Sequence, residues 1–419
     1  MRLEGLAEVA ADAEALSSQI RRMRARLFAP GETKTLRPFT SAETARLLGV
    51  SDSYLRHLAR AGEGPAPATA ANGRRVYTLE QIHALRAHLA AKGEGKGGRV
   101  ALPRRRPGDH LQVLAVTNFK GGSGKTTTSA HLAQHLALRG YRTLAVDLDP
   151  QASLTSLFGC QPEADLEPGQ TVYGAIRYDD PKPLASLVRP TYMAGLDLVP
   201  GHLELHEFEH DTPRVLARRE AAGAPFYARL AGALQSVEAD YDVVVLDCPP
   251  QLGFLTLGAL CAATGVLVTV HPQMLDIASM SQFLAMTSEL MGVVEEAGAK
   301  VELDFLRYVV TRHEPSDGPQ AQVVGFLRGL FGDRVLTHTM LKSTAMADAG
   351  LTKQTLYETG RDGMTRSTYE RAIDSLEAVN GEIEGLVRRA WGREGAEAEA
   401  INALGAVAAE MRRIAREAA

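Results

Sequence analysis

The chain has 419 residues, of which 45% are hydrophobic and 23% are charged. This is the balance of a soluble globular protein, and the length predicts two or three domains rather than one core. There is no run of about 18 apolar residues and no apolar signal segment at the start, so we expect a cytoplasmic protein without a membrane-spanning helix. The three cysteines have no CxxC spacing, which argues against a disulfide framework or a zinc site.

The formal net charge of −4 conceals an asymmetry along the chain. Residues 1–107 contain 19 Lys and Arg against 10 Asp and Glu, whereas the remaining residues contain 27 against 40. A basic front on an acidic body favours a nucleic-acid contact in the front. Solvated helices can also be basic, so charge alone is weak evidence.

Residues 1–37 predict one helix that ends near residue 29. Its apolar residues recur at spacings of three and four, which is typical of a coiled-coil seam. We expect a dimerisation segment, with a helix packed on its own domain as the alternative. The seam consists of Leu6, Val9, Ala13, Leu16, Ile20, Met23 and Leu27.

Residues 38–91 predict a winged helix-turn-helix domain. Ser41 and Ser51 are expected to cap two short helices, and Gly49 lies in the turn between them. Arg74 and Arg75 follow in a turn and strand that resembles the wing and would contact the DNA backbone. The alternative is a small helical packing module. The small core would consist of Ala45, Leu48, Val50, Leu55 and Leu58. The second helix would present to a major groove Ser53, Tyr54, Arg56, His57 and Arg60.

Residues 92–109 combine glycine, proline and charge, which predicts a linker. From residue 110 to 375, apolar runs alternate with helical segments. This pattern predicts an α/β fold with a doubly wound, mostly parallel sheet. Residues 376–419 predict a helical extension. The expected strands are 113–116, 143–146, 243–246, 266–270 and 308–310.

The first of these strands runs into a glycine-rich loop and then a helix that ends before Gly140. Strand, glycine loop and helix form the context of a phosphate-binding loop, because converging backbone N–H groups and the helix N-terminus attract phosphate. Lys125 would contact the β- and γ-phosphates of ATP, and Thr126 would ligate Mg²⁺. The nucleotide-binding residues in this stretch are Lys120, Gly121, Gly122, Ser123, Gly124, Lys125, Thr126 and Thr127.

The loop departs from the G-x-x-x-x-G-K-[ST] pattern, because Phe119 replaces its first glycine and Lys120 follows. This loop resembles the deviant Walker loop of the ParA/MinD family of ATPases. The resemblance implies a homodimer with ATP sandwiched between the subunits, in which Lys120 acts on the partner's nucleotide.

Two acidic motifs support the resemblance. Asp147 and Asp149 follow the second strand, and Asp247 ends an apolar strand in the manner of a Walker B motif. Carboxylates at strand ends lie at the sheet edge where ligands bind. The resemblance implies that Asp149 orients the attacking water, that Asp147 is structural or near the metal, and that Asp247 holds Mg²⁺ through water.

With the DNA-binding front included, the chain resembles large ParA proteins, and most closely the RepA partition proteins of repABC-type plasmids. This resemblance covers residues 38 to 375. It implies a nucleoid-associated ATPase, weakly active alone, that segregates plasmid DNA, is stimulated by a ParB- or RepB-like centromere-binding partner, and represses its own operon at operator DNA. Thr311 and Arg312 would lie at the adenine. Nonspecific DNA would contact Arg361, Arg366 and Arg371.

Three alternatives share the loop. A MinD-like membrane-associated ATPase needs a basic amphipathic C-terminal helix, but Glu394, Glu397 and Glu399 follow Arg388 and Arg389. A nitrogenase-reductase-like electron carrier needs cysteines that ligate a cluster. A repressor with a vestigial ATP site would lack turnover.

Overall fold

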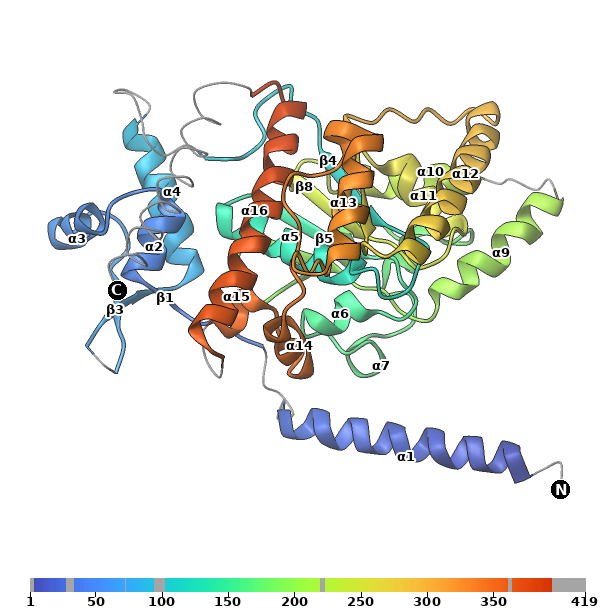
Figure 1. Cartoon of the computed structure of the whole chain (residues 1–419), viewed down its shortest axis with the longest axis horizontal. Helices are drawn as coiled ribbons and strands as arrows, with labels where there is room; N and C mark the ends of the chain where they lie inside the picture. The colour runs from blue at the N-terminus through green and yellow to red at the C-terminus, as the bar shows by residue number, and fades with distance from the viewer. Residues whose placement is uncertain are drawn as a thin grey trace.

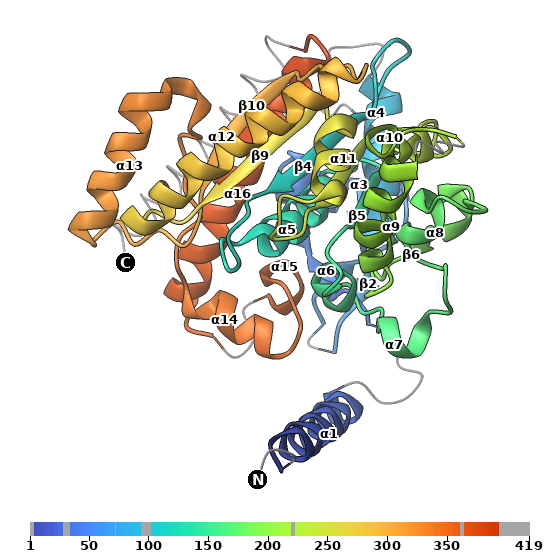
Figure 2. The ribbon, with the colours of Figure 1, turned by 90° about the vertical axis from the view of Figure 1, so that its right-hand side faces the viewer.

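The computed structural model describes residues 4–27, 34–71, 73–93, 102–218, 223–360 and 364–393. Helix α1 (Glu4–Leu27) lies apart from the rest of the chain in both views (Figures 1 and 2). Val9 and Leu16 of the predicted seam are 66% and 64% exposed. The described part of this helix therefore does not pack on its own domain, and its role in dimerisation stays a prediction.

The basic front folds as a winged helix-turn-helix, with a three-stranded antiparallel sheet in the order β1-β3-β2. Ser51 accepts a hydrogen bond from the Tyr54 N–H, as predicted, and Gly49 is left-handed. The cap of the first helix is Thr40 and not Ser41. Thr40 and Glu43 form a reciprocal capping box, which Ser41 is too late in the chain to make. The elements are β1 (Phe39–Thr40), α2 (Ser41–Leu48), α3 (Asp52–Ala61), β2 (Ala68–Thr69), β3 (Arg75–Tyr77) and α4 (Leu79–Gly93).

The second sheet has seven strands in the order β10-β9-β4-β8-β5-β7-β6, and only the edge strand β6 is antiparallel. All five expected strands are present. β7 was not predicted, because its four residues include Asp197 and do not form an apolar run. The strands are β4 (Gln112–Thr117), β5 (Thr143–Asp147), β6 (Arg189–Pro190), β7 (Leu196–Val199), β8 (Val243–Asp247), β9 (Gly265–Val270) and β10 (Phe305–Val310).

Helices cover both faces of this sheet (Figures 1 and 2). Alternate residues of β4 enter two separate apolar cores, as a doubly covered strand requires. One core is completed by α5 (Lys125–Arg139), α6 (Ser153–Leu157), α14 (Thr344–Leu351), α15 (Leu356–Thr359) and α16 (Arg366–Ala390). The other is completed by α8 (Val172–Ile176), α9 (Leu205–Arg218), α10 (Phe226–Gln235), α11 (Phe254–Ala262), α12 (Met274–Glu296) and α13 (Gly318–Phe331). Three short helical elements lie between these longer elements along the chain, namely α7 (Pro162–Asp165), η1 (Leu184–Leu187) and η2 (Gly332–Arg334).

The boundary expected at residue 375 lies inside α16. This helix buries Leu376, Val379 and Ile383 in the core that also contains α5. Residues 376–390 are therefore part of the sheet's covering layer and not an appended extension. The later part of the predicted extension, from residue 394, lies outside the described residues.

The winged helix and the ATPase sheet share one apolar core. Leu48, Leu55 and Leu85 belong to the same buried cluster as Leu132 and Leu136 of α5. Arg86 of α4 crosses this junction: its Nη2 donates to Leu47 O at 2.7 Å and to Leu138 O at 3.3 Å. These carbonyls lie at the C-terminal ends of α2 and α5, so one guanidinium caps a helix in each domain.

Among the described residues, one helix is long and apolar enough to cross a membrane by length and composition alone, namely α12. It follows β9 and buries Met280 and Phe283 against the sheet. This is the packing of a covering helix in an α/β fold.

Candidate nucleotide site and DNA-binding surface

The phosphate loop lies between the end of β4 and the first turn of α5, at the carboxyl edge of the sheet. Gly122 and Gly124 have φ of 78° and 89°, a left-handed backbone that favours glycine. Both glycines belong to the predicted loop. A residue with a side chain would be strained at these φ angles, in a loop whose N–H groups must converge.

Two residues that sequence analysis missed hold the loop against β9. The Asn118 side chain donates to Thr269 O at 2.5 Å and accepts from the Lys120 N–H at 3.0 Å. Thr269 Oγ1 donates to Ser123 Oγ at 3.0 Å. Both lie at the carboxyl ends of neighbouring strands, which is the signal that would have drawn attention to them. These hydrogen bonds hold the loop against β9.

Lys125 lies over the loop. Its ammonium donates to Lys120 O at 3.1 Å. Burial lowers the pKa of Lys125, and the nearby Asp247 carboxylate opposes that shift. A partly desolvated cation at the start of a helix is suited to bind phosphate oxygens.

Lys120 lies elsewhere, at the α12 side of the loop. Its ammonium pairs with Asp276 of α12, and Asp276 Oδ2 is 3.2 Å from His271 Nδ1. Phe119, in place of the usual glycine, stacks on Phe283 with ring centroids 5.9 Å apart. Phe119 and Lys120, the two residues that depart from the usual loop pattern, are therefore the ones that contact α12.

The two strand-end aspartates face each other across the β5–β8 register, where Asp147 pairs with Asp247. Both are fully buried. Asp147 accepts hydrogen bonds from Asp149 N and from Thr155 N and Oγ1, which favours the structural of its two proposed roles. Burial and the neighbouring Asp147 raise the pKa of Asp247.

Asp247 has the features of a cation ligand. Its Oδ1 accepts from Ser129 Oγ at 2.9 Å, but its Oδ2 is buried without a hydrogen-bond partner among the described residues. An unpartnered carboxylate oxygen in a buried site is costly unless a cation or proton satisfies it. The Thr126 hydroxyl also acts on this carboxylate. The pair therefore fits Mg²⁺, a hard cation that binds oxygen ligands.

Asp149 lies two residues beyond the end of β5 and is half-buried. Its N–H donates to Asp147 Oδ1 at 3.1 Å, and its own Oδ1 accepts from the Gln151 N–H at 2.9 Å. It lies near enough to Lys125 to act on it electrostatically. These bonds hold the Asp149 carboxylate at the phosphate-loop edge of the sheet.

Thr311 and Arg312, expected at the adenine, contact the loop itself. Thr311 Oγ1 donates to Ser123 O at 2.7 Å, and Arg312 Nη1 donates to Gly122 O at 3.2 Å. Arg312 has φ of 52°, which is unusual for a residue with a side chain. Both residues donate to backbone carbonyls of the glycine loop, and their assignment to the adenine stays a prediction.

Helix α3 presents all five of its predicted DNA contacts to solvent. Leu55 and Leu58 are buried on the opposite side. In the wing, Arg74 is exposed and Arg75 is half-buried. The exposed residues of α3 are Ser53, Tyr54, Arg56, His57 and Arg60.

The predicted nonspecific DNA residues are less clearly grouped. Arg366 pairs with Glu370 at 3.0 Å, and Arg371 is exposed. Arg361 lies outside the described residues. A pairing with Glu370 reduces the net charge that Arg366 offers to DNA.

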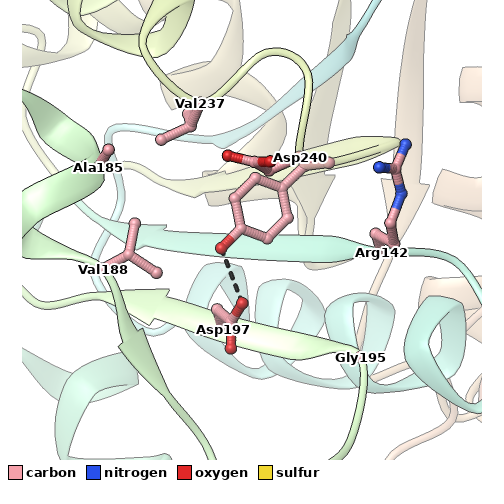
Figure 3. A pocket seen from close by; sticks show the side chains of 8 residues that line it. Arg142, Ala185, Val188, Gly195, Asp197, Val237 and Asp240 are labelled. Carbon is pink, nitrogen blue, oxygen red and sulfur yellow. Dashed lines mark hydrogen bonds between the residues drawn. The ribbon is translucent and has the colours of Figure 1, made fainter.

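A pocket of about 400 Å³ opens at the amino edge of β5, β7 and β8, opposite the phosphate loop (Figure 3). Tyr241 lines it, and its hydroxyl donates to Asp197 Oδ2 at 2.7 Å. None of the nucleotide-site residues lines it. Its walls are Arg142, Ala185, Val188, Gly195, Asp197, Val237, Asp240 and Tyr241.

Two family models match the chain. A model described as an AAA domain matches residues 111–297, and one described as a MerR family regulatory protein matches residues 40–77. Among solved structures, a partition protein covers 92% of this chain and 99% of its own, with a TM-score of 0.63 and 19% identity. A complex of a Cyanothece McdA variant with ATP covers 69% and 99%, with a TM-score of 0.54 and 20% identity. At these identities the structures establish the fold alone.

The sequence relatives are more specific. A putative replication protein A from Rhizobium rhizogenes is 55% identical over 91% of this chain and 94% of its own. The chromosome-partitioning ATPase Soj of Thermus thermophilus is 34% identical over 64% of this chain and 96% of its own. Protein SopA of Escherichia coli K12 is 29% identical over 86% and 92%. With its phosphate loop, strand-end aspartates and MerR-like front, the chain belongs to the ParA-type partition ATPases that carry an N-terminal DNA-binding region.

Proposed function

We propose that this ATPase segregates plasmid DNA by dimerising around ATP and binding DNA as a dimer. The observation that carries the proposal is the separation of two lysines in one loop. Lys125 lies over the loop's own backbone, whereas Lys120 lies at the α12 side with a side chain that is 43% exposed. This separation supports a role for Lys125 at the nucleotide of its own subunit and a role for Lys120 at the nucleotide of the partner.

The catalytic roles follow from charge. Mg²⁺ would neutralise the β- and γ-phosphates, held by Thr126 directly and by Asp247 through water. Lys125 and Lys120 would stabilise the charge that develops on the transferred phosphoryl group. Asp149 would orient the attacking water. Thr127 and the loop N–H groups would complete the phosphate contacts.

We infer that hydrolysis is weak in the isolated protein. In phosphoryl transfer, catalysis is mostly positioning and charge stabilisation, so a site completed by a second subunit turns over slowly until both subunits are correctly placed. A ParB- or RepB-like partner would supply that placement and so release the dimer from DNA.

The winged helix would bind operator DNA and repress the protein's own operon. Its exposed α3 face combines polar and basic side chains, which suits a major groove. Nonspecific DNA would contact Arg361, Arg366 and Arg371 in the dimer. We expect a nucleoid-associated, cytoplasmic protein, and no feature of the described residues favours the MinD-like membrane alternative.

The test is ATP turnover and molar mass by light scattering, with and without DNA and the partner protein. The wild type should dimerise with ATP and hydrolyse it slowly, and DNA plus partner should accelerate turnover. Lys125→Ala should lose nucleotide binding, whereas Lys120→Ala should bind ATP but stay monomeric. If Lys120→Ala dimerised normally with ATP, the trans role of Lys120 would be wrong.

A further inference from the structure

Lys120 is held by a buried acid of its own subunit. Asp276 lies in the first turn of α12, and its side chain is only 7% exposed. Asp276 Oδ1 accepts a hydrogen bond from the Lys120 ammonium, while Asp276 Oδ2 lies 3.2 Å from His271 Nδ1. A carboxylate so far removed from water needs a partner charge or several hydrogen bonds.

The balancing charge comes from Lys120. Burial lowers the pKa of His271, and Arg312, Lys120 and Lys342 lower it further. The imidazole is therefore neutral at neutral pH and contributes a hydrogen bond but no charge. Lys120 is therefore the cation that is paired directly with the buried Asp276 carboxylate.

The backbone on both sides of this ion pair is fixed. Asn118 ties the loop to Thr269 of β9, and Phe119 stacks on Phe283 two turns further along α12. A change of partner by Lys120 therefore requires only its side chain to change rotamer. Such a motion is fast and leaves the frame of the site unchanged.

We propose that Asp276 is a positioning residue whose carboxylate binds the Lys120 ammonium of its own subunit. This carboxylate competes for the ammonium with the phosphates of the partner's nucleotide. This rests on the trans role of Lys120 proposed above. ATP-dependent dimerisation then occurs only when the partner's phosphates attract Lys120 more strongly than Asp276 does. A symmetric dimer needs Lys120 released in both subunits, so if about one subunit in ten has it released, apparent dimer affinity falls about 100-fold.

The first experiment needs no dimer. Amine acylation of the nucleotide-free protein, read peptide by peptide by mass spectrometry, reports how firmly each lysine is paired. Asp276→Asn should raise the acylation rate of Lys120 several-fold, and Asp276→Glu, which keeps the charge, should stay near the wild type. Lys342, paired with Glu314 at 2.8 Å, is the internal control and should not change. An unchanged rate at Lys120 in Asp276→Asn would overturn the proposal.

The second experiment measures ATP-dependent dimerisation against protein concentration. With release in about one subunit in ten, Asp276→Asn should reach half-dimerisation at about one hundredth of the wild-type concentration. Glu296→Gln removes an exposed acid from the far end of α12 and should match the wild type. Damage to the fold would weaken dimerisation, so a gain cannot come from that cause. Dimerisation of Asp276→Asn equal to or weaker than wild type, with Lys120→Ala still monomeric, would contradict the retention of Lys120 and leave the sandwich dimer standing. If the wild type fails to dimerise while Lys120 acylation still responds to Asp276→Asn, the proposed dimer is wrong and the retention is real.

Discussion

Two carboxylates meet at the centre of the site because of strand register. Asp147 and Asp247 end neighbouring parallel strands at the same level, so their charges repel within a buried space. Asp147 resolves this by accepting three hydrogen bonds, whereas Asp247 Oδ2 has none among the described residues. The site thus divides its acids into one that supports the loop after β5 and one that is available to a cation.

Asp149 carries the first residue-scale prediction. Asp149→Ala should keep ATP binding and dimerisation but lower turnover by about 100-fold or more, because the carboxylate that orients water is lost. The ATP dimer should then accumulate on DNA, which gel-shift and phosphate-release assays can follow together. Asp348→Ala, at an exposed position of α14, is the matched control. Normal turnover in Asp149→Ala would show that another residue orients the water.

His135 carries a second residue-scale prediction, in pH. It lies buried between α5 and α16, 3.3 Å from Glu384, and the Glu377 and Glu384 carboxylates outweigh burial and raise its pKa to about 9. A raised folded pKa stabilises the protein fully below about pH 6.5, and that stability is lost as pH rises through about 9. The loss amounts to at most about 3 kcal/mol.

This pH dependence is measured by urea unfolding between about pH 6 and pH 9.5. The wild type should lose more stability over that range than His135→Gln, which has no proton to lose. Equal slopes for the two proteins would mean that His135 is neutral in the folded state.

At the scale of elements, α5 links the site to the DNA-binding domain. It begins at Lys125 in the phosphate loop and ends at Arg139, beside α4. At that end Arg86 contacts Leu138 O, and His83 Nε2 lies 2.8 Å from Ala137 O. One helix therefore follows the phosphate loop at its N-terminus and contacts the winged helix at its C-terminus.

Removing the Arg86 guanidinium should weaken this junction. Arg86→Met would leave Leu47 O and Leu138 O without their buried donor, at a cost of about 2–4 kcal/mol. Thermal unfolding should shift down, and limited proteolysis should cut faster between residues 94 and 101. Arg46→Met, an exposed arginine of α2 next to Leu47, should leave both unchanged. A normal melting temperature in Arg86→Met would mean that apolar packing alone holds the junction.

The exposed face of helix α3 gives a prediction on how the protein recognises the base sequence of its operator. Arg56→Ala should weaken operator binding by about 1–3 kcal/mol if Arg56 contacts a base edge, with a smaller effect on nonspecific DNA. Arg46→Ala, which removes a positive charge from α2 of the same domain, is the control for a general loss of charge. A footprint unchanged by Arg56→Ala would place the base contacts on other residues.

For the whole molecule, the sequence predicted the elements better than their junctions. Long apolar strands and the glycine loop carry strong local patterns, so β4, β5, β8, β9 and β10 were found. β7 was missed because Asp197 interrupts it. Contacts such as Asn118 with Thr269, or Lys120 with Asp276, join residues about 150 positions apart, and no local pattern encodes them. The burial of α16 was missed for a different reason: composition alone does not show the apolar spacing of three and four that marks its buried face, which consists of Leu376, Val379, Ile383, Leu386 and Val387.

The shared core also limits how new DNA specificity can be engineered or evolve. A winged helix grafted whole from a relative would bring its own surface against α5 and would have to reproduce the Arg86 caps and the contact of His83 with Ala137 O. The outward face of α3 has no part in that junction. Retargeting to a different operator therefore requires only substitutions on that face, whereas exchange of the domain requires redesign of the phosphate-loop helix with it.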